Sequence, residues 1–283
     1  MEMLVSTQWL AEHVEDPDLR ILECTVNLRP GEDGGYVAEP SLEAWEQGHI
    51  AGSVYADVTN DLSDPESPLR FTMPSPERFA EGMERLGVGE GTRVVLYDRR
   101  FTMWATRVWW MLRSMGFDNA AVLDGGWKAW TSEGRPVATG PAPQRPPMAF
   151  VPNPRPELIA DVEDVLSAME GDTCIVNALS PGNHDGSDTT YGGRGHIPGA
   201  ANVYAVSLVD SDTHCYLPLA QLRSVFDDAA GSKVDRPIIT YCGGGIAATS
   251  DAFILTLLGH ENVAVYDGSL SEWTSDPGRP LEV

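Results

Sequence analysis

The chain carries two copies of one sequence pattern. The segment GHIAGSVYADV at 48–58 recurs as GHIPGAANVYAV at 195–206. The apolar run VVLYD, which ends at Asp98, recurs as IITYC, which ends at Cys242. A third stretch, MGFDNAAVLDGGWKAW, recurs as LGHENVAVYDGSLSEW. The matches keep the same order at a nearly constant offset, which indicates an internal duplication and therefore two similar domains.

A proline-rich stretch separates the copies. Residues 134–156 contain eight prolines, and proline fixes φ and removes a backbone donor, so this stretch is typical of an extended linker. A length of 283 residues also suits two cores better than one. The sequence predicts a first domain over 1–137, a linker over 138–156 and a second domain over 157–283.

Strand-like and helix-like runs alternate within each copy. In the second copy, CIVNAL, IITYC and VAVYD read as short buried strands. After IITYC, apolar residues recur at helical spacing up to Gly259, a natural helix stop. This order predicts an α/β fold of two tandem domains, each a mainly parallel sheet flanked by helices. Ligands bind beyond the carboxyl ends of such strands, where Cys242 and, in the first copy, Asp98 stand.

Charge and hydropathy exclude several classes of partner. The net charge of −23 disfavours binding to nucleic acid and to anionic membrane surfaces. No apolar run approaches the roughly 20 residues of a membrane span. The N-terminus lacks a basic segment followed by an apolar one. We therefore expect a cytoplasmic protein with neither a membrane nor a nucleic acid as partner.

Three of the four cysteines carry no sign of chemistry. Neither a CxxC pair nor a zinc-like His/Cys spacing is present, so we expect no metal. Cys24 and Cys174 lie in strand-like apolar runs and are predicted to be small buried hydrophobes. Cys215 lies in a polar loop and has no visible activating neighbour other than His214, which leaves open a role in resolving or accepting sulfur.

Cys242 differs because of the sequence that follows it. In YCGGGIAA a thiol precedes three glycines and the first turn of a predicted helix. Glycines let successive N–H groups point at one centre, and a helix start adds free N–H groups. Such a cradle stabilises a thiolate or a persulfide anion. The residues alone leave open an ordinary strand-to-helix turn that happens to hold a cysteine.

The combined motifs resemble a known family. YCGGGIAA, with GHIPGA before it and VAVYDGSLSEW after it, resembles the catalytic half of tandem-domain rhodanese-type sulfurtransferases, the thiosulfate and 3-mercaptopyruvate sulfurtransferases. RVWWMLRSMGF and VLDGGWKAW resemble their inactive half, in which Asp98 takes the place of the cysteine. The resemblance implies an active-site loop of six residues, namely Cys242, Gly243, Gly244, Gly245, Ile246 and Ala247.

The resemblance also implies a reaction. A sulfane sulfur would pass from a small anionic donor, 3-mercaptopyruvate or thiosulfate, to a persulfide on Cys242. Cyanide or a thiol, such as that of a reduced thioredoxin-like protein, would then accept it. This covalent route requires no cofactor.

Several departures from the family pattern bear on the donor. Loops selective for thiosulfate usually carry basic side chains after the cysteine, whereas Gly243 and Gly244 carry none. Mercaptopyruvate enzymes have small uncharged loops, usually with a serine and a threonine where this chain has Gly244 and Ala247. The family's substrate arginine, in the motif Asp-Ala-Arg, is replaced by Leu179. The loop favours 3-mercaptopyruvate slightly and leaves thiosulfate open.

An anionic donor needs a cation in so acidic a protein. The candidates are Arg99 and Arg100, just past Asp98, and Arg194 beside His196. His49 and His196 recur in both copies, which favours a role in holding a loop over one in proton transfer.

Two other classes of function compete with sulfur transfer. A cysteine phosphatase needs an arginine that closes a seven-residue loop, and the chain has Ala248 there. A catalytically degenerate rhodanese-like module that binds a protein or carries sulfide is the other alternative. It differs in an observable way, because such a module forms no persulfide on Cys242 with any donor.

Overall fold

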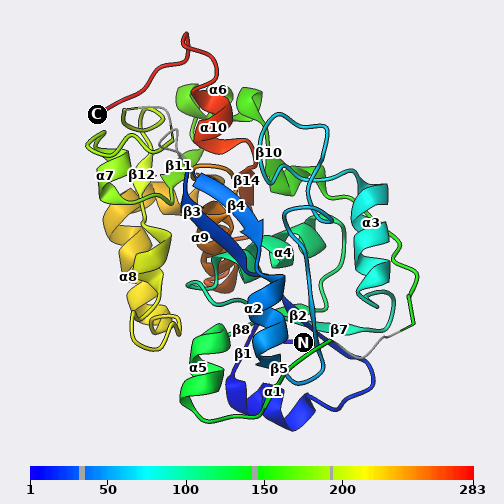
Figure 1. Ribbon diagram of the computed structural model, residues 1–283. Coiled ribbons are helices and arrows are strands. Elements are labelled where there is room, and N and C mark those ends of the chain that lie inside the picture. The colour runs from blue at the N-terminus through cyan, green and yellow to red at the C-terminus, as the bar shows by residue number, and fades with distance from the viewer. Residues whose placement is uncertain (32–35, 142–145, 192–193) are drawn as a thin grey trace.

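The chain forms two α/β domains that lie against each other (Figure 1). The computed structural model describes residues 1–31, 36–141, 146–191 and 194–283. Part of the predicted linker, 142–145, lies outside the described residues.

The first domain is built on a five-stranded parallel sheet in the order β1-β8-β7-β2-β6. Its strands are β1 (Leu4–Val5), β2 (Leu19–Glu23), β6 (Ser53–Tyr55), β7 (Arg93–Tyr97) and β8 (Ala120–Leu123). Its helices are α1 (Thr7–His13), α2 (Leu42–Gln47), α3 (Pro76–Arg85), α4 (Met103–Ser114) and α5 (Gly126–Ser132). Two antiparallel pairs complete it, β3 (Val26–Pro30) with β4 (Tyr36–Pro40) and β5 (His49–Ile50) with β9 (Val137–Ala138).

The second domain repeats this plan strand for strand, in the order β10-β14-β13-β11-β12, again all parallel. Its strands are β10 (Ile159–Ala160), β11 (Cys174–Asn177), β12 (Ala201–Asn202), β13 (Ile238–Tyr241) and β14 (Val263–Tyr266). Its helices are α6 (Val162–Glu170), α7 (Pro181–His184), α8 (Leu219–Ala230), α9 (Ala247–Leu257) and α10 (Ser269–Trp273), with 3₁₀ turns η1 (Pro156–Leu158), η2 (Ala205–Leu208) and η3 (Gly231–Asp235). The predicted fold class and the three predicted strands of this copy are confirmed. The central strands are apolar on both faces because helices cover both sides of the sheet.

The two domains meet along α4 and α9, which occupy the centre of the molecule (Figure 1). Trp109 of α4 packs edge-on against Phe253 of α9, with ring centroids 4.9 Å apart. The hydroxyl groups of Thr106 and Thr249 lie 3.1 Å apart across the same contact. Since α4 follows β7 and α9 follows β13, this packing brings the carboxyl ends of both central strands to the domain boundary.

The segment between the domains packs along the first one. Beyond β9, the described part of 139–155 forms no helix or strand. The Phe150 ring lies against Phe79 with centroids 5.6 Å apart, and the Asn153 N–H donates to the Met115 carbonyl (2.8 Å). This extended stretch is therefore anchored to the first domain by a ring contact and a backbone hydrogen bond.

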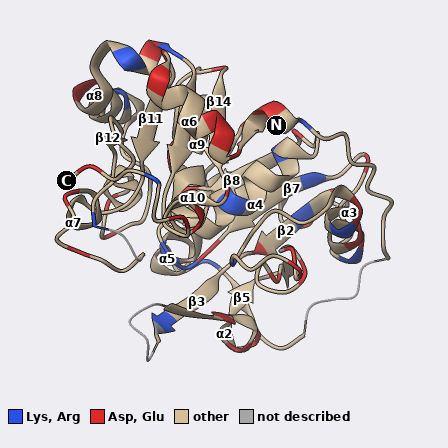
Figure 2. Cartoon of the chain, turned by 90° about the horizontal axis from the view of Figure 1, so that it is seen from above, with Lys and Arg blue, Asp and Glu red and all other residues tan. Residues whose placement is uncertain are grey.

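Asp and Glu residues lie on the outer elements of both domains (Figure 2). Among the described residues, no helix is long and apolar enough to cross a membrane. In the same part of the chain, no three His, Cys, Asp or Glu side chains gather as ligands for a metal ion.

One carboxyl group lies in the core without a partner. Asp251 of α9 has no solvent exposure, and neither of its oxygens has a hydrogen-bond partner among the described residues. Burial raises the pKa of this carboxyl well above its ordinary 3.8. The folded protein therefore holds a proton there that the unfolded chain releases as the pH rises, so the contribution of Asp251 to stability falls above about pH 4.

We expect Asp251→Asn to be more stable than the wild type at neutral pH. Asparagine has no proton to lose, so the difference in free energy of unfolding between the two proteins should widen from pH 5 toward pH 7, with a slope of at most about 1.4 kcal/mol per pH unit. Urea denaturation at the two pH values measures it. Asp212→Asn, at an exposed position, is the matched control and should leave the pH dependence unchanged. Parallel stability curves for the wild type and Asp251→Asn would contradict the expectation.

Candidate active site

Cys242 lies at the carboxyl end of β13 and opens a tight turn into α9. Its side chain is only 3% exposed. Gly245, three residues on, has φ of +74°, and a Cβ there would lie 2.7 Å from the Asp267 carbonyl oxygen. The turn therefore requires glycine at this position for both its conformation and its close packing.

Ser269 fixes the turn from the neighbouring strand end. Its Oγ accepts hydrogen bonds from the N–H groups of Cys242 (3.1 Å) and Gly245 (3.0 Å), and donates to the Tyr266 carbonyl (2.8 Å). The Leu270 N–H donates to the Cys242 carbonyl (3.0 Å). Sequence reasoning missed Ser269, although the third repeated motif marks it by placing a serine where the first copy has a glycine.

In the first domain, the turn that corresponds to the one after Cys242 binds an anion, the carboxylate of Asp98. The Asp98 carboxylate, at the place of Cys242, accepts four backbone hydrogen bonds. One oxygen binds the N–H groups of Arg100 (2.6 Å) and Thr102 (3.2 Å), and the other those of Trp104 (2.8 Å) and Ala105 (2.9 Å). Burial raises the pKa of Asp98 to about 6 and these bonds oppose the rise, so the carboxylate is ionised at neutral pH.

Two of the corresponding donors around Cys242 are unoccupied, whereas a third, the Thr249 N–H, donates to the Ile246 carbonyl (3.0 Å). By the duplication, Gly244 and Ile246 match the residues whose N–H groups bind the first Asp98 oxygen. Within the described chain, the N–H groups of Gly244 and Ile246 donate to no protein atom. The turn therefore offers free donors beside a sulfur atom, an arrangement that stabilises a thiolate or a persulfide.

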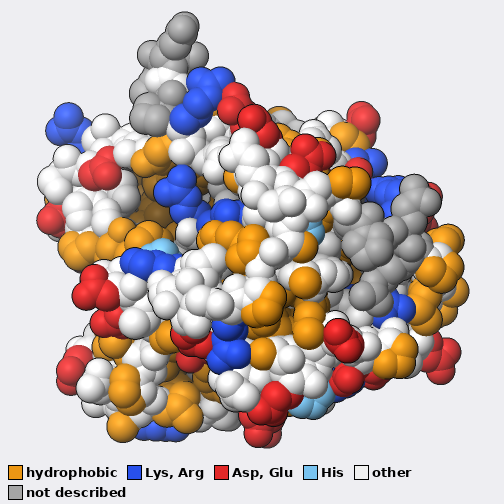
Figure 3. Space-filling view, turned by 60° about the horizontal axis from the view of Figure 1, so that its bottom comes forward, with side chains coloured by type: hydrophobic (Ala, Val, Ile, Leu, Met, Phe, Trp, Pro, Cys, Tyr) orange, Lys and Arg blue, Asp and Glu red, His pale blue; other side chains and the backbone are white. Residues whose placement is uncertain are grey.

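Cys242 opens onto a cavity of about 490 Å³ between the domains. Most of its walls are apolar and aromatic and come from both domains; among them are Tyr36, Phe71, Trp104, Leu179, Tyr191 and Ile246. Figure 3 shows a hollow with hydrophobic walls on one face of the molecule, with Lys or Arg side chains beside it. A second cavity, of about 370 Å³, shares several of these walls.

The three arginines predicted to bind the donor lie at different places relative to the two cavities. Arg100 lines the second cavity, and Arg194 is exposed and lines neither. The Arg99 guanidinium lies 4.3 Å from the Trp127 ring and donates to the Ala44 carbonyl (3.2 Å), so it points away from both cavities.

The cation that does line the cavity with Cys242 is Arg70. Sequence reasoning missed it, because it lies in the segment between β6 and α3 of the first domain, outside every repeated motif. Leu179, at the place of the family arginine, lines both cavities with its apolar side chain.

The paired histidines contact backbone in both copies. His49 Nδ1 lies 2.9 Å from the Trp45 carbonyl oxygen, and His196 Nδ1 lies 2.7 Å from that of His184. Each ring also stacks on the side chain of the same residue. These contacts favour the loop-holding role that the sequence predicts.

The other thiols lie outside the cavity. Cys24 and Cys174 are buried in the core, as predicted. Cys215 is half-buried, and burial raises the pKa of its thiol.

Comparison with known proteins adds the following. The family model of the rhodanese-like domain matches residues 6–133 and 162–276. The chain is 35% identical to the 3-mercaptopyruvate sulfurtransferase of Escherichia coli K12, over 98% of this chain and 97% of that one. It is 32% identical to the sulfur carrier protein TtuD of Thermus thermophilus (99% and 96%) and 33% identical to the thiosulfate sulfurtransferase of Rattus norvegicus (95% and 91%).

The solved structures agree in fold. The crystal structure of SseA from Escherichia coli, a 3-mercaptopyruvate sulfotransferase, superposes with a TM-score of 0.82 at 33% identity, covering 95% of this chain and 99% of that one. Tum1 from Saccharomyces cerevisiae superposes with a TM-score of 0.85 at 23% identity, covering 100% and 99%.

Proposed function

The chain belongs to the rhodanese-like family and is a sulfurtransferase, and from this we propose that it carries the transferred sulfur as a persulfide on Cys242. The two domains then have different roles. The second domain supplies the nucleophile, and the first, with Asp98 at the matching place, supplies one wall of the cavity.

One observation carries this proposal. In the first domain the turn after the central strand holds a carboxylate through four backbone N–H groups. The matching turn in the second domain, in which Ile246 has φ of −92° where Thr102 has +64°, holds a thiol, and the amides of Gly244 and Ile246 are free. An anion on the sulfur of Cys242 would supply the acceptor that those amides lack.

The first half-reaction loads the cysteine. The Cys242 thiolate attacks the outer sulfur of the donor, and an S–S bond forms as the donor's bond to that sulfur breaks. With 3-mercaptopyruvate a C–S bond breaks, the electron pair goes to carbon, and the thiol proton ends on that carbon to give pyruvate. With thiosulfate an S–S bond breaks and sulfite leaves.

The second half-reaction releases the sulfur. An acceptor thiolate or cyanide attacks the outer sulfur of the persulfide, and the Cys242 thiolate leaves unchanged. The products are the acceptor persulfide or thiocyanate. A reduced thioredoxin-like protein is one acceptor with the required chemistry.

The uncharged loop favours 3-mercaptopyruvate over thiosulfate as the donor. Gly243, Gly244 and Ile246 line the cavity without a basic side chain, so the dianionic thiosulfate would meet only backbone donors in the loop. The monoanionic 3-mercaptopyruvate requires less positive charge near Cys242.

A second candidate function is sulfur carriage without turnover. The likeness to the sulfur carrier protein TtuD favours it, since a carrier holds the sulfur until a specific partner takes it. A carrier and an enzyme share the loaded Cys242 and differ in the rate at which small thiols unload it.

The first test is sulfur loading of the reduced protein. Incubation with 3-mercaptopyruvate, and separately with thiosulfate, is expected to add the mass of one sulfur atom to the peptide that contains Cys242. Intact and peptide mass spectrometry after removal of the donor measure the gain. No gain from either donor, in folded protein whose thiol still reacts with an alkylating agent, would favour the degenerate binding module.

A further inference from the structure

The cavity in front of Cys242 has one charged side chain among the residues that line it. Among its lining residues in the described chain, only Arg70 is basic, and none is Asp or Glu. The whole chain carries a net charge of −23, so a small anion approaches against a repulsive field. Among the described lining residues, Arg70 is therefore the one whose charge attracts an anion.

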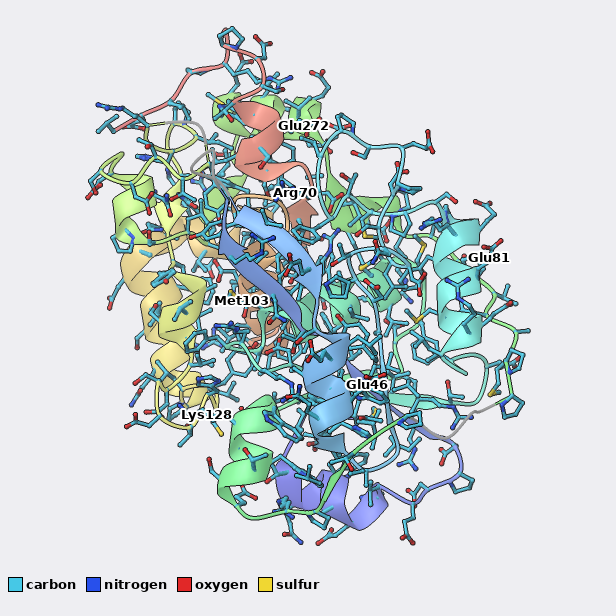
Figure 4. All side chains as sticks on the ribbon, in the orientation of Figure 1. Glu46, Arg70, Glu81, Met103, Lys128 and Glu272 are labelled. Carbon is cyan, nitrogen blue, oxygen red and sulfur yellow. The ribbon has the colours of Figure 1, made fainter. Side chains whose placement is uncertain are left out.

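Arg70 reaches the catalytic turn from the other domain. A Cβ placed on Gly244 would lie 3.9 Å from the Arg70 carbonyl oxygen, so the two segments are in contact. The side chain extends near β4, where one of its Nη atoms donates to the Tyr36 carbonyl (Figure 4). In the described part of the chain Arg70 forms no ion pair, and its side chain is exposed.

A buried ion pair holds the segment of Arg70 in place. Phe71 has φ of +63°, unusual for a bulky residue, and its carbonyl accepts a hydrogen bond from Arg107. The Met73 N–H donates to Asp267 (2.8 Å), which pairs with Arg107 (2.6 Å). The first-domain segment is thus docked onto the second domain beside the catalytic turn.

We propose that Arg70 binds the anionic group of the sulfur donor while Cys242 attacks its sulfur, so that the substrate site is composite and its cation comes from the non-catalytic domain. This inference rests on the proposed function. A guanidinium can bind a carboxylate or the sulfonate end of thiosulfate with two parallel hydrogen bonds, and at Arg70 these donors are not engaged by a protein carboxylate. The location also accounts for Leu179, since an arginine there is not needed when the charge arrives from the opposite wall.

The alkylation of Cys242 tests this without turnover. Iodoacetate and iodoacetamide both alkylate the thiolate at their CH2 carbon and release iodide, but only iodoacetate carries a carboxylate. In Arg70→Gln we expect the rate constant for iodoacetate at Cys242, divided by that for iodoacetamide, to fall about tenfold. The rate constant for iodoacetamide itself should be unchanged. Arg70→Lys, which keeps the positive charge but lacks the planar guanidinium, should give an intermediate ratio. Arg100→Gln, in the neighbouring cavity, is the matched control and should keep the wild-type ratio.

Steady-state kinetics provide the second readout. Loss of a contact that is made equally to the bound donor and to the transition state raises KM and leaves kcat unchanged. Arg70→Gln should therefore raise the KM for 3-mercaptopyruvate about 10- to 100-fold. An unchanged alkylation ratio and KM, or a fall in the ratio with Arg100→Gln in place of Arg70→Gln, would overturn the assignment. Failure of the wild type to load sulfur would refute the proposed function alone, because the alkylation ratio still reports whether Arg70 attracts anions to Cys242.

Discussion

Replacement of Cys242 by serine is expected to abolish sulfur transfer, lowering kcat/KM with either donor by at least about 10³-fold. The serine hydroxyl fits the same turn, but it is not ionised near neutral pH and forms no persulfide. The loaded species should disappear from the mass spectrum as well, which separates loss of chemistry from loss of donor binding. Thiocyanate or pyruvate formation measures turnover.

The matched control is Cys215→Ser. This half-buried thiol does not line the cavity that contains Cys242, so its removal should leave turnover within about twofold of the wild type. Turnover of Cys242→Ser at the wild-type rate would show that another residue carries the sulfur, and Cys215 would then be the first residue to examine.

Arg107→Met should strongly destabilise the fold. The Arg107 side chain has no solvent exposure, and its partner Asp267 is 10% exposed, with 2.6 Å between the charged groups. Removal of one member leaves the other charge buried and unpaired, which typically costs about 3–5 kcal/mol. The same guanidinium donates to the Gly245 carbonyl (3.2 Å), so the turn that follows Cys242 loses a support as well. Urea denaturation measures the change in the free energy of unfolding.

Arg113→Met, on the same helix, provides the comparison. Its side chain is 26% exposed and lies 3.6 Å from Asp118. Exposed ion pairs contribute about 0–1 kcal/mol, so this variant should stay close to the wild type. Equal destabilisation by the two substitutions would mean that the cost arises from helix α4 itself and not from the ion pair between the domains.

The repeat predicts much of this fold because it constrains both halves at once. The strands that end at Asp98 and Cys242 are apolar enough to read directly, and each lies at the centre of a parallel sheet. The sheet order could not be predicted, since strand order depends on contacts between segments far apart in sequence. The short edge strands β1 and β10 have two residues each, too few to show a period.

The candidate active site also has parts that the sequence predicts and parts that it does not. The six-residue turn is predictable because its chemistry depends on adjacent residues, a thiol followed by glycines and a helix start. Ser269, Arg70 and Arg107 are not predictable from such a local pattern, because each acts on the turn from a distant part of the chain. The candidates Arg99 and Arg100 follow Asp98 directly, but the turn after Asp98 sends the Arg99 side chain toward Trp127 and Arg100 into the neighbouring cavity.

The depth of Cys242 has a consequence for which sulfur atom an incoming thiol can reach. Cys242 is only 3% exposed where it lines the cavity, so in the proposed persulfide we expect the outer sulfur atom to be the more accessible of the two. Attack on the inner atom would give a mixed disulfide and free hydrogen sulfide, and attack on the outer atom passes the sulfur on. If the inner atom is shielded in the persulfide proposed above, the fold would favour one of two outcomes that are both available to an exposed persulfide, and would so direct the regiochemistry of transfer.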